Sequence, residues 1–130
     1  MNIILSIKPK WAEKIYSGEK TIEWRKNAPK NADDHSIIFL YETVPICKVT
    51  GCMRFDGATA YDFIHLPVVP RQALKLSGCV QPKDLDKYQG KSKEIYAWRF
   101  YGAFKFIIPK TLEEFSLKRP PQSWCYTEYE

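Results

Sequence analysis

The first eighteen residues show two successive hydrophobic patterns. Residues 2–7 form a short apolar run, which predicts a strand. Residues 9–17 are predicted to form a helix, because Pro9 stands just inside its start and Gly18 just past its end. A helix this short is marginal alone, so its apolar face must pack on a sheet. That face contains Trp11, Ala12, Ile15 and Tyr16.

The next stretch reads as a strand with one apolar and one charged face. Successive side chains of a strand point to opposite faces, so Ile22 and Trp24 would face the core. Glu23 and Arg25 would lie on the other face, with Lys20 at the turn just before them. These three ionisable side chains are a candidate polar site. The ordinary alternative is a solvated surface with ion pairs of about 0–1 kcal/mol.

The rest of the chain predicts more short elements. Strands are expected at 36–42, 48–56, 94–100 and 103–108, with a hairpin turn at Tyr101-Gly102. Short helices are expected at 70–78 and 82–90, and this pair could cover a cleft. Residues 111–114 fit a capping box. Strands interspersed with short helices predict an α+β fold, either a partly open barrel or a strongly bent sheet.

The segment after residue 117 is predicted to be a stiff extended tail. Pro120 and Pro121 argue against a central strand there. The tail carries Arg119, Gln122 and Trp124, which could reach a ligand. It could also serve as a docking segment for another protein.

Composition indicates one well-packed domain over residues 1–130. Hydrophobic residues make up 45% of the chain and aromatic residues 15%, which argues against disorder. No apolar run approaches the roughly 20 residues of a membrane span. The N-terminus also lacks the pattern of a signal peptide. A cytoplasmic location without membrane association is therefore expected.

Neither the cysteines nor the histidines predict a metal site. The four cysteines form no Cys-x-x-Cys pair, and the only histidines are His35 and His65. Without a secretion signal, reduced thiols are expected rather than disulfides. No glycine-rich phosphate loop is present. We expect no metal and no cofactor.

Positive charge is concentrated near the N-terminus. The formal net charge is +5, and residues 1–30 hold seven Lys or Arg against three Glu, a local net charge of +4. A basic face of this kind favours a polyanion through counterion release. Trp11 and Trp24 fit amphipathic patterns and are expected in the core. Core packing is also favoured for Trp98, while Trp124 could either pack or stack on a base.

The segment Gly18-x-Lys20-x-x-Glu23-x-Arg25 resembles the signature of the ASCH domain family, relatives of the PUA domains. Residues 5–15 are similar to the opening strand and helix of that family, and residues 117–126 resemble the endings of small bacterial and phage members. The resemblance implies a small PUA-like mixed β-barrel of about five to six strands with short helices at its ends. It also implies a cleft beside the signature strand.

Two functions follow from the resemblance and stay open. PUA relatives bind RNA, so Lys20, Glu23, Arg25, Arg119, Gln122 and Trp124 would bind RNA or a nucleotide. Single-stranded RNA is favoured over duplex DNA because no predicted helix is long and basic enough to fill a major groove. No enzymatic activity is assigned on this hypothesis.

The alternative is a hydrolase, because some small ASCH relatives cleave the acetyl amide of N4-acetylcytidine and others are reported as ribonucleases. In the amidohydrolase pattern, the lysine activates a threonine three residues later. Lys20 matches the lysine, but Glu23 replaces the threonine. Glu23 could instead act as a general base on water, with Lys20 or Arg25 stabilising an oxyanion. In the amidohydrolase pattern a separate glutamate assists the reaction. The candidates for this assisting role here are Glu42, Asp84, Asp86 and Glu94, and the sequence does not choose among them.

Overall fold

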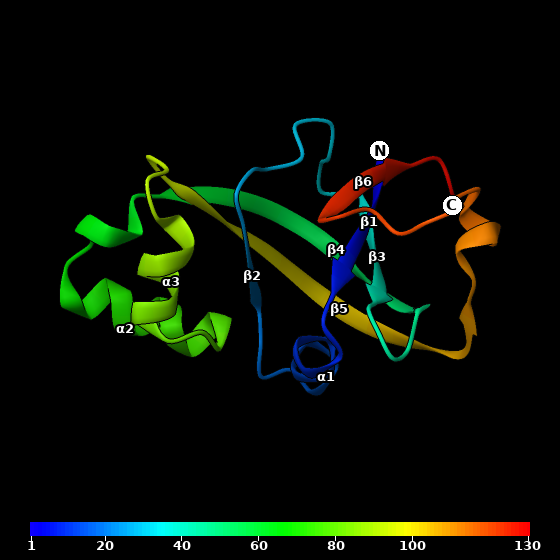
Figure 1. Ribbon diagram of the computed structural model, residues 1–130, viewed down its shortest axis with the longest axis horizontal. Coiled ribbons are helices and arrows are strands. Elements are labelled where there is room, and N and C mark those ends of the chain that lie inside the picture. Colours follow the sequence, from blue (N-terminus) through cyan, green and yellow to red (C-terminus); the bar gives the residue numbers. More distant parts are fainter.

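The computed structural model describes residues 1–130 and contains one curled, six-stranded sheet. The strand order is β2-β5-β4-β3-β1-β6, in which β1 and β3 are parallel and all other neighbours are antiparallel. The strands are β1 (Asn2–Ile7), β2 (Ile22–Arg25), β3 (Ile37–Glu42), β4 (Lys48–Tyr61), β5 (Ile95–Lys110) and β6 (Trp124–Thr127). Figure 1 shows the long strands β4 and β5 crossing the whole molecule. The predicted α+β fold with a small, partly open barrel is confirmed.

Three short helices accompany the sheet: α1 (Pro9–Ser17), α2 (Val68–Gly78) and α3 (Pro82–Gln89). Single 3₁₀ turns occur at Phe63–His65 and Leu112–Phe115. The first helix has the predicted bounds because Pro9 fixes its first turn and Gly18 ends it in the left-handed region, at φ 87°. The pair α2 and α3 is inserted between β4 and β5 and lies at one end of the molecule (Figure 1). None of the helices has the length and apolar character needed to cross a membrane.

Both faces of the central strands are buried, which explains their uninterrupted apolar runs. In β1, Ile3 and Leu5 belong to the main core under α1, whereas Ile4 faces a second cluster with Phe39 and Phe115. A third cluster joins β2 and β5 to the helical insertion. It contains Trp24, Phe63, Leu85, Ile95 and Ala97. The insertion is therefore packed through its own apolar core on the strand that carries the signature.

The predicted hairpin at Tyr101-Gly102 is wrong. The two predicted strands are one strand, β5, which continues to Lys110 beside β4. Gly102 has a φ of 63°, and the β4–β5 register shifts between Cys52 and Arg54. Glycine in this conformation can begin a hairpin or occupy a β-bulge. Here the long β4 supplies a pairing partner on both sides of Gly102, so the chain bulges and does not reverse.

The two ends of the sheet are joined by side chains. Arg25 of edge strand β2 donates from Nη2 to the carbonyl of Ser6 in β1 (2.9 Å) and from Nη1 to Oγ of Ser123, just before β6 (3.0 Å). Trp98 Nε1 donates to the carbonyl of Asn27, and Trp124 Nε1 donates to the Oδ1 of the same residue. Trp124 thus begins an edge strand and is not part of an extended tail, although Pro120 and Pro121 stay outside the sheet as expected.

Candidate functional site

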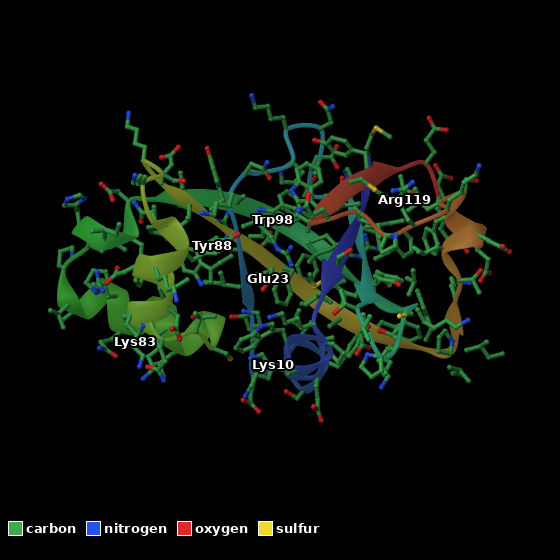
Figure 2. The ribbon with its side chains drawn as sticks, viewed as in Figure 1. Lys10, Glu23, Lys83, Tyr88, Trp98 and Arg119 are labelled. Atoms are coloured by element: carbon green, nitrogen blue, oxygen red, sulfur yellow. The ribbon has the colours of Figure 1, made fainter.

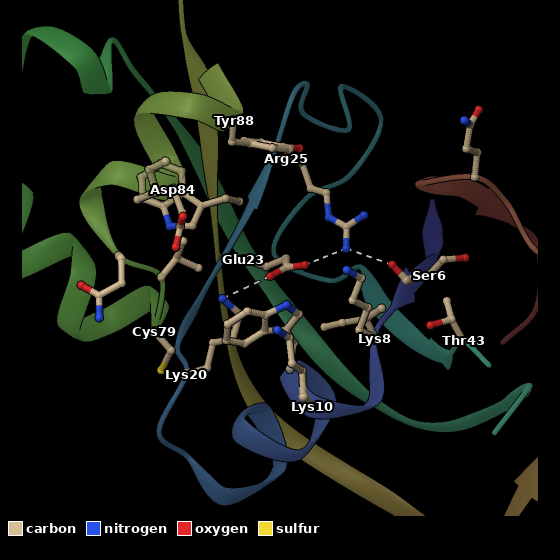
Figure 3. A pocket seen from close by; sticks show the side chains of 17 residues that line it. Ser6, Lys8, Lys10, Lys20, Glu23, Arg25, Thr43, Cys79, Asp84 and Tyr88 are labelled. Carbon is tan, nitrogen blue, oxygen red and sulfur yellow. Dashed lines mark hydrogen bonds and ion pairs between the residues drawn. The ribbon is translucent and has the colours of Figure 1, made fainter. Parts of the chain in front are cut away.

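A cavity of about 680 Å³ opens beside the signature strand. Its floor is β2, which contributes Lys20 from the preceding turn and Glu23 and Arg25 from the strand. One wall is formed by the end of β1 and the start of α1, and the opposite wall by α3 and the segment before it (Figure 3). The predicted cleft beside Gly18–Arg25 is therefore present as a geometric feature.

Glu23 lies at the centre of the cavity floor between two cations. Its Oε1 is 3.2 Å from Lys20 Nζ, and its Oε2 accepts a hydrogen bond of 2.6 Å from Arg25 Nη2. The exposed fractions of the three side chains are 9% for Glu23, 1% for Lys20 and 13% for Arg25. These fractions exclude the alternative of a solvated strand face with exposed ion pairs. Burying three charges carries a desolvation penalty that close pairing offsets only in part.

Lys20 is held by the C-terminal end of α2 as well as by Glu23. Its Nζ donates to the carbonyl of Gly78, and the backbone N–H of Thr21 donates to the carbonyl of Ser77 at 2.8 Å. Carbonyls at a helix C-terminus carry partial negative charge and stabilise a nearby cation. The position of α2 therefore fixes the position of the Lys20 ammonium group.

Positive charge predominates in the cavity. The buried cluster holds two cations and one carboxylate, a formal net charge of +1 (Lys20 and Arg25 against Glu23). Lys8 and Lys10 add two cations at the rim, and Asp84 adds one carboxylate from α3, so the ionised lining has a net charge of +2. The Nε of Arg25 is buried without a hydrogen-bond partner. A ligand with negative or strongly polar oxygens would match this environment.

Two aromatic side chains from opposite walls face the same cavity: Trp11 of α1 and Tyr88 of α3. The ammonium groups of Lys10 and Lys20 lie 4.6 and 5.2 Å from the centroid of the Trp11 ring. Burial raises the pKa of Tyr88, the charge of Arg25 opposes the shift, and the charge of Glu23 adds to it.

Trp11 differs from its prediction as a core residue. It is only partly buried, because α1 presents one edge of its apolar face to the cavity. Sequence reasoning also missed the contribution of α3 to the wall. Asp84 and Tyr88 are four residues apart and lie on one helix face, so their spacing was a usable signal. The orientation of that face could not be read from the sequence.

The residues of the predicted tail are divided between the cavity and other surroundings. Gln122 lines the cavity, but Arg119 and Trp124 do not. Arg119 is exposed and lies away from Glu23, next to the C-terminal part of the chain (Figure 2). Trp124 packs edge-on against Trp98, with ring centroids 5.4 Å apart. Trp98 is fully buried, as favoured from the sequence.

The four acidic residues proposed to assist Lys20 also lie in different surroundings. Of Glu42, Asp84, Asp86 and Glu94, only Asp84 lines the cavity. Asp86 is bound to Arg71 at 2.7 Å, and Glu94 accepts a hydrogen bond from the Tyr96 hydroxyl. No group of three or more His, Cys, Asp or Glu side chains is arranged to hold a metal ion. All four cysteines are free.

The curled sheet, its short helices and the cleft beside β2 define a small PUA-like α+β fold. Residues 5–110 match the family model of the ASCH domain, and the chain therefore belongs to the ASCH domain family. The family membership expected from the sequence is thus confirmed.

Solved structures share the fold. The crystal structure of ASCH from Zymomonas mobilis matches with a TM-score of 0.80 and 22% identity over 96% of this chain and 86% of that chain. A single-substitution variant of the same protein gives a TM-score of 0.80 with 22% identity, over 96% and 88% of the two chains. The hypothetical protein PH0355 matches at 0.53 with 14% identity, over 79% and 97%. No curated protein gave a significant match. At these identities the structural similarity concerns the fold alone.

Proposed function

We propose that this protein binds RNA or a nucleotide in the cleft formed by Lys20, Glu23 and Arg25. The observation that carries the proposal is the buried cluster of two cations on one carboxylate, at the floor of a cavity of about 680 Å³. The cluster leaves one positive charge without a protein counter-charge. A base carbonyl oxygen would accept a charge-assisted hydrogen bond from these cations in a site already shielded from water.

The aromatic walls favour a ligand with a flat face. Trp11 and Tyr88 border the cavity from opposite sides, and every nucleobase has a face that can stack on an aromatic ring. Stacking contributes about 1–3 kcal/mol per base. The rim lysines Lys8 and Lys10 are exposed and suited to phosphate contacts. We infer that the base enters the cavity and its phosphates stay at the rim.

Single-stranded RNA or a free nucleotide suits this geometry better than a duplex. The three helices are 9, 11 and 8 residues long and pack on the sheet or on each other, so none is free to enter a groove. Unpaired bases can be turned into a pocket and read at their edges. Gln122, which lies in the segment before β6, would hydrogen-bond to the amide group of a base. Arg119 would contact a flanking phosphate outside the cavity. Trp124 would fix the segment that carries Gln122.

Binding of a labelled single-stranded RNA, measured by fluorescence polarisation at about 50 and about 200 mM salt, tests the proposal. Affinity should fall as salt rises, and Lys20→Met should weaken it at least about tenfold by removing a charge-assisted contact. Lys48→Met is the matched control, because Lys48 is exposed and does not line the cavity. Equal affinity of Lys20→Met and the wild type would contradict the proposal.

Lys20 is buried, so its variant could also lose stability. Gln122→Ala therefore serves as a second variant, because Gln122 is exposed at the cavity edge. Thermal unfolding followed by circular dichroism checks that each variant is folded. A folded Gln122→Ala protein should bind the RNA more weakly. Wild-type affinity in both cleft variants would show that RNA binds elsewhere.

Hydrolysis is the second candidate function, favoured by a carboxylate placed next to two cations inside the cavity. Glu23 would take a proton from water as the water oxygen attacks an acetyl carbonyl, while Lys20 or Arg25 would stabilise the oxyanion. Cleavage of the C–N bond of N4-acetylcytidine would then give acetate and cytidine, with the proton passing to the leaving nitrogen. Thr21 offers no alternative nucleophile, because it does not line the cavity.

The same preparation distinguishes the two candidates. Incubation with N4-acetylcytidine, followed by chromatography for cytidine, tests the amidohydrolase, and incubation with RNA followed by gel electrophoresis tests a ribonuclease. Turnover that Glu23→Gln abolishes would support the hydrolase. RNA binding without formation of either product would support binding as the function and count against both hydrolytic activities.

A further inference from the structure

Asp84 is the one carboxylate in the cavity lining that no cation neutralises. The other carboxylate of the lining, Glu23, is held between two cations. Asp86, two residues further along α3, is bound to Arg71 at 2.7 Å. Asp84 itself has no cation within ion-pair distance, although it lines the cavity. Both of its carboxylate oxygens are therefore free to accept hydrogen bonds from a ligand.

The two walls of the cavity differ in charge. Lys8 lies on one side of Glu23, and Asp84 lies on the other side, on α3 (Figure 3). Lys10 adds a second cation to the wall that carries Lys8. A phosphate is attracted by these lysines and repelled by Asp84. Because phosphate and base are at opposite ends of a nucleotide, the base would lie against the α3 wall.

The rest of the α3 wall is suited to the face of a base. Its other lining residues carry no charge: Cys79, Val80, Gln81, Leu85 and Tyr88. Tyr88 comes four residues after Asp84, on the same face of the helix. An aromatic ring in this position can stack on the base while Asp84 contacts its edge.

Hydrogen-bonding groups of opposite type meet where the floor joins this wall. The cations of the floor, Lys20 and Arg25, only donate hydrogen bonds, and the ionised Asp84 only accepts them. The two oxygens of one carboxylate can accept from two neighbouring N–H groups. The matching base edge therefore has a carbonyl oxygen followed by two N–H donors.

Guanine is the RNA base with this edge, because its O6 is followed by N1–H and the N2 amino group. Uracil has a single N–H between two carbonyls, so one carbonyl oxygen would face Asp84. Cytosine has an unprotonated ring nitrogen beside its amino group, and adenine has no carbonyl. Each of these three bases leaves a polar group of the site without its complement, which weakens binding.

We propose that the cavity selects guanine and that Asp84 determines this specificity. The Asp84 carboxylate accepts hydrogen bonds from N1–H and the N2 amino group, while O6 accepts from the cations of the floor. This inference rests on the proposed binding of RNA or a nucleotide. Gln122, which lies in the segment before β6, then contacts the neighbouring base of the RNA.

Fluorescence polarisation at about 50 mM salt, with short labelled RNAs that differ only in their central base, tests the proposal. Uridines flank a central guanosine, adenosine, cytidine, uridine or inosine. The wild type should bind the guanosine RNA at least about tenfold more tightly than the adenosine, cytidine and uridine RNAs. Inosine keeps O6 and N1–H but lacks the N2 amino group, so its RNA should bind about threefold more weakly than the guanosine RNA.

Asp84→Asn removes the charge and one of the two acceptor oxygens at nearly constant size. The variant should bind the guanosine and inosine RNAs equally within about twofold, and its preference for guanosine over adenosine should fall at least about fivefold. Because Asp84 is exposed, the variant should fold normally. Asp34→Asn is the matched control, since Asp34 is 80% exposed and does not line the cavity. It should keep the wild-type order of affinities.

The outcomes separate this inference from the proposed function. Equal affinity of the wild type for all the RNAs would overturn the selection of guanine and leave RNA binding intact. An Asp84→Asn protein that keeps the full preference, or that loses binding to every RNA, would overturn the role of Asp84. Failure of the wild type to bind any of the RNAs would overturn the proposed function, and this inference with it.

Discussion

Replacing Glu23 with glutamine keeps the shape of the side chain but removes the only negative charge between Lys20 and Arg25. The carboxylate makes contacts of 3.2 Å to Lys20 and 2.6 Å to Arg25. Hydrogen bonds to charged groups contribute about 1.5–3 kcal/mol each, and removing one member of a buried ion pair costs about 3–5 kcal/mol. The amide oxygen can still accept one bond, so we expect a loss near the lower limit, about 3 kcal/mol.

A loss of this size is a large part of the stability of a small domain, which is typically about 5–15 kcal/mol. It corresponds to a fall in melting temperature of about 10 °C for a chain of this length. Urea unfolding followed by tryptophan fluorescence, with circular dichroism as a second probe, would measure it. The m-value should stay unchanged, which shows that stability and not compactness has altered.

Two further variants test the electrostatic reasoning. Glu19→Gln removes the partner of Lys14 in an exposed ion pair and should leave unfolding unchanged within error. Lys20→Met added to Glu23→Gln removes one of the two unpaired cations. The double variant should therefore lose less stability than the sum of the single losses, by at least about 1 kcal/mol. Additive losses, or a Glu23→Gln loss below about 1 kcal/mol, would refute the view that Glu23 neutralises buried cations.

Three other predictions concern the scaffold. Gly51→Ala should destabilise the protein by about 1–3 kcal/mol in urea unfolding, because the added Cβ would collide with the backbone oxygen of Phe104 and with the Tyr16 hydroxyl. Unchanged stability would mean that these groups can move apart. Burial raises the pKa of Tyr16 to about 12, so its contribution to stability should be complete below about pH 10 and lost as pH rises from there towards 12. The free energy of unfolding, measured at graded pH, should fall over this range in the wild type and fall less steeply in Tyr16→Phe. Equal slopes would show that Tyr16 is not the group responsible for the pH dependence. Thr111→Ala should cost about 1 kcal/mol by breaking the capping box with Glu114, and a loss of circular dichroism signal at lower temperature would report it.

Local sequence patterns were sufficient for several elements. The strand Asn2–Ile7, the helix Pro9–Ser17 and the capping box at Thr111 all have the expected positions. In the helix and the capping box, residues close in sequence supply the deciding interaction: a proline in the first turn, a left-handed glycine or a reciprocal cap. The Lys20, Glu23 and Arg25 side chains were also expected together, since a turn and strand alternation bring them close.

Other features depended on pairing between distant segments. Gly102 is compatible with a hairpin or a bulge, and only the presence of a long β4 beside it selects the bulge. Strand β4 likewise continues to Tyr61, well past the expected end at Asp56, because β5 pairs with it there. Trp124 could have stacked on a ligand, but Trp98 and Asn27 hold its indole ring.

The sequence by itself determined the α+β class, the short helices and the charged signature beside Gly18. Only the tertiary structure decided that this charged face is buried. Glu23 lies under a wall formed by α3, about sixty residues later in the chain, and Lys20 is held by the carbonyl of Gly78. The physical reason is that burial and electrostatic environment are set by what packs over a strand, whereas alternation specifies only which side chains share a face.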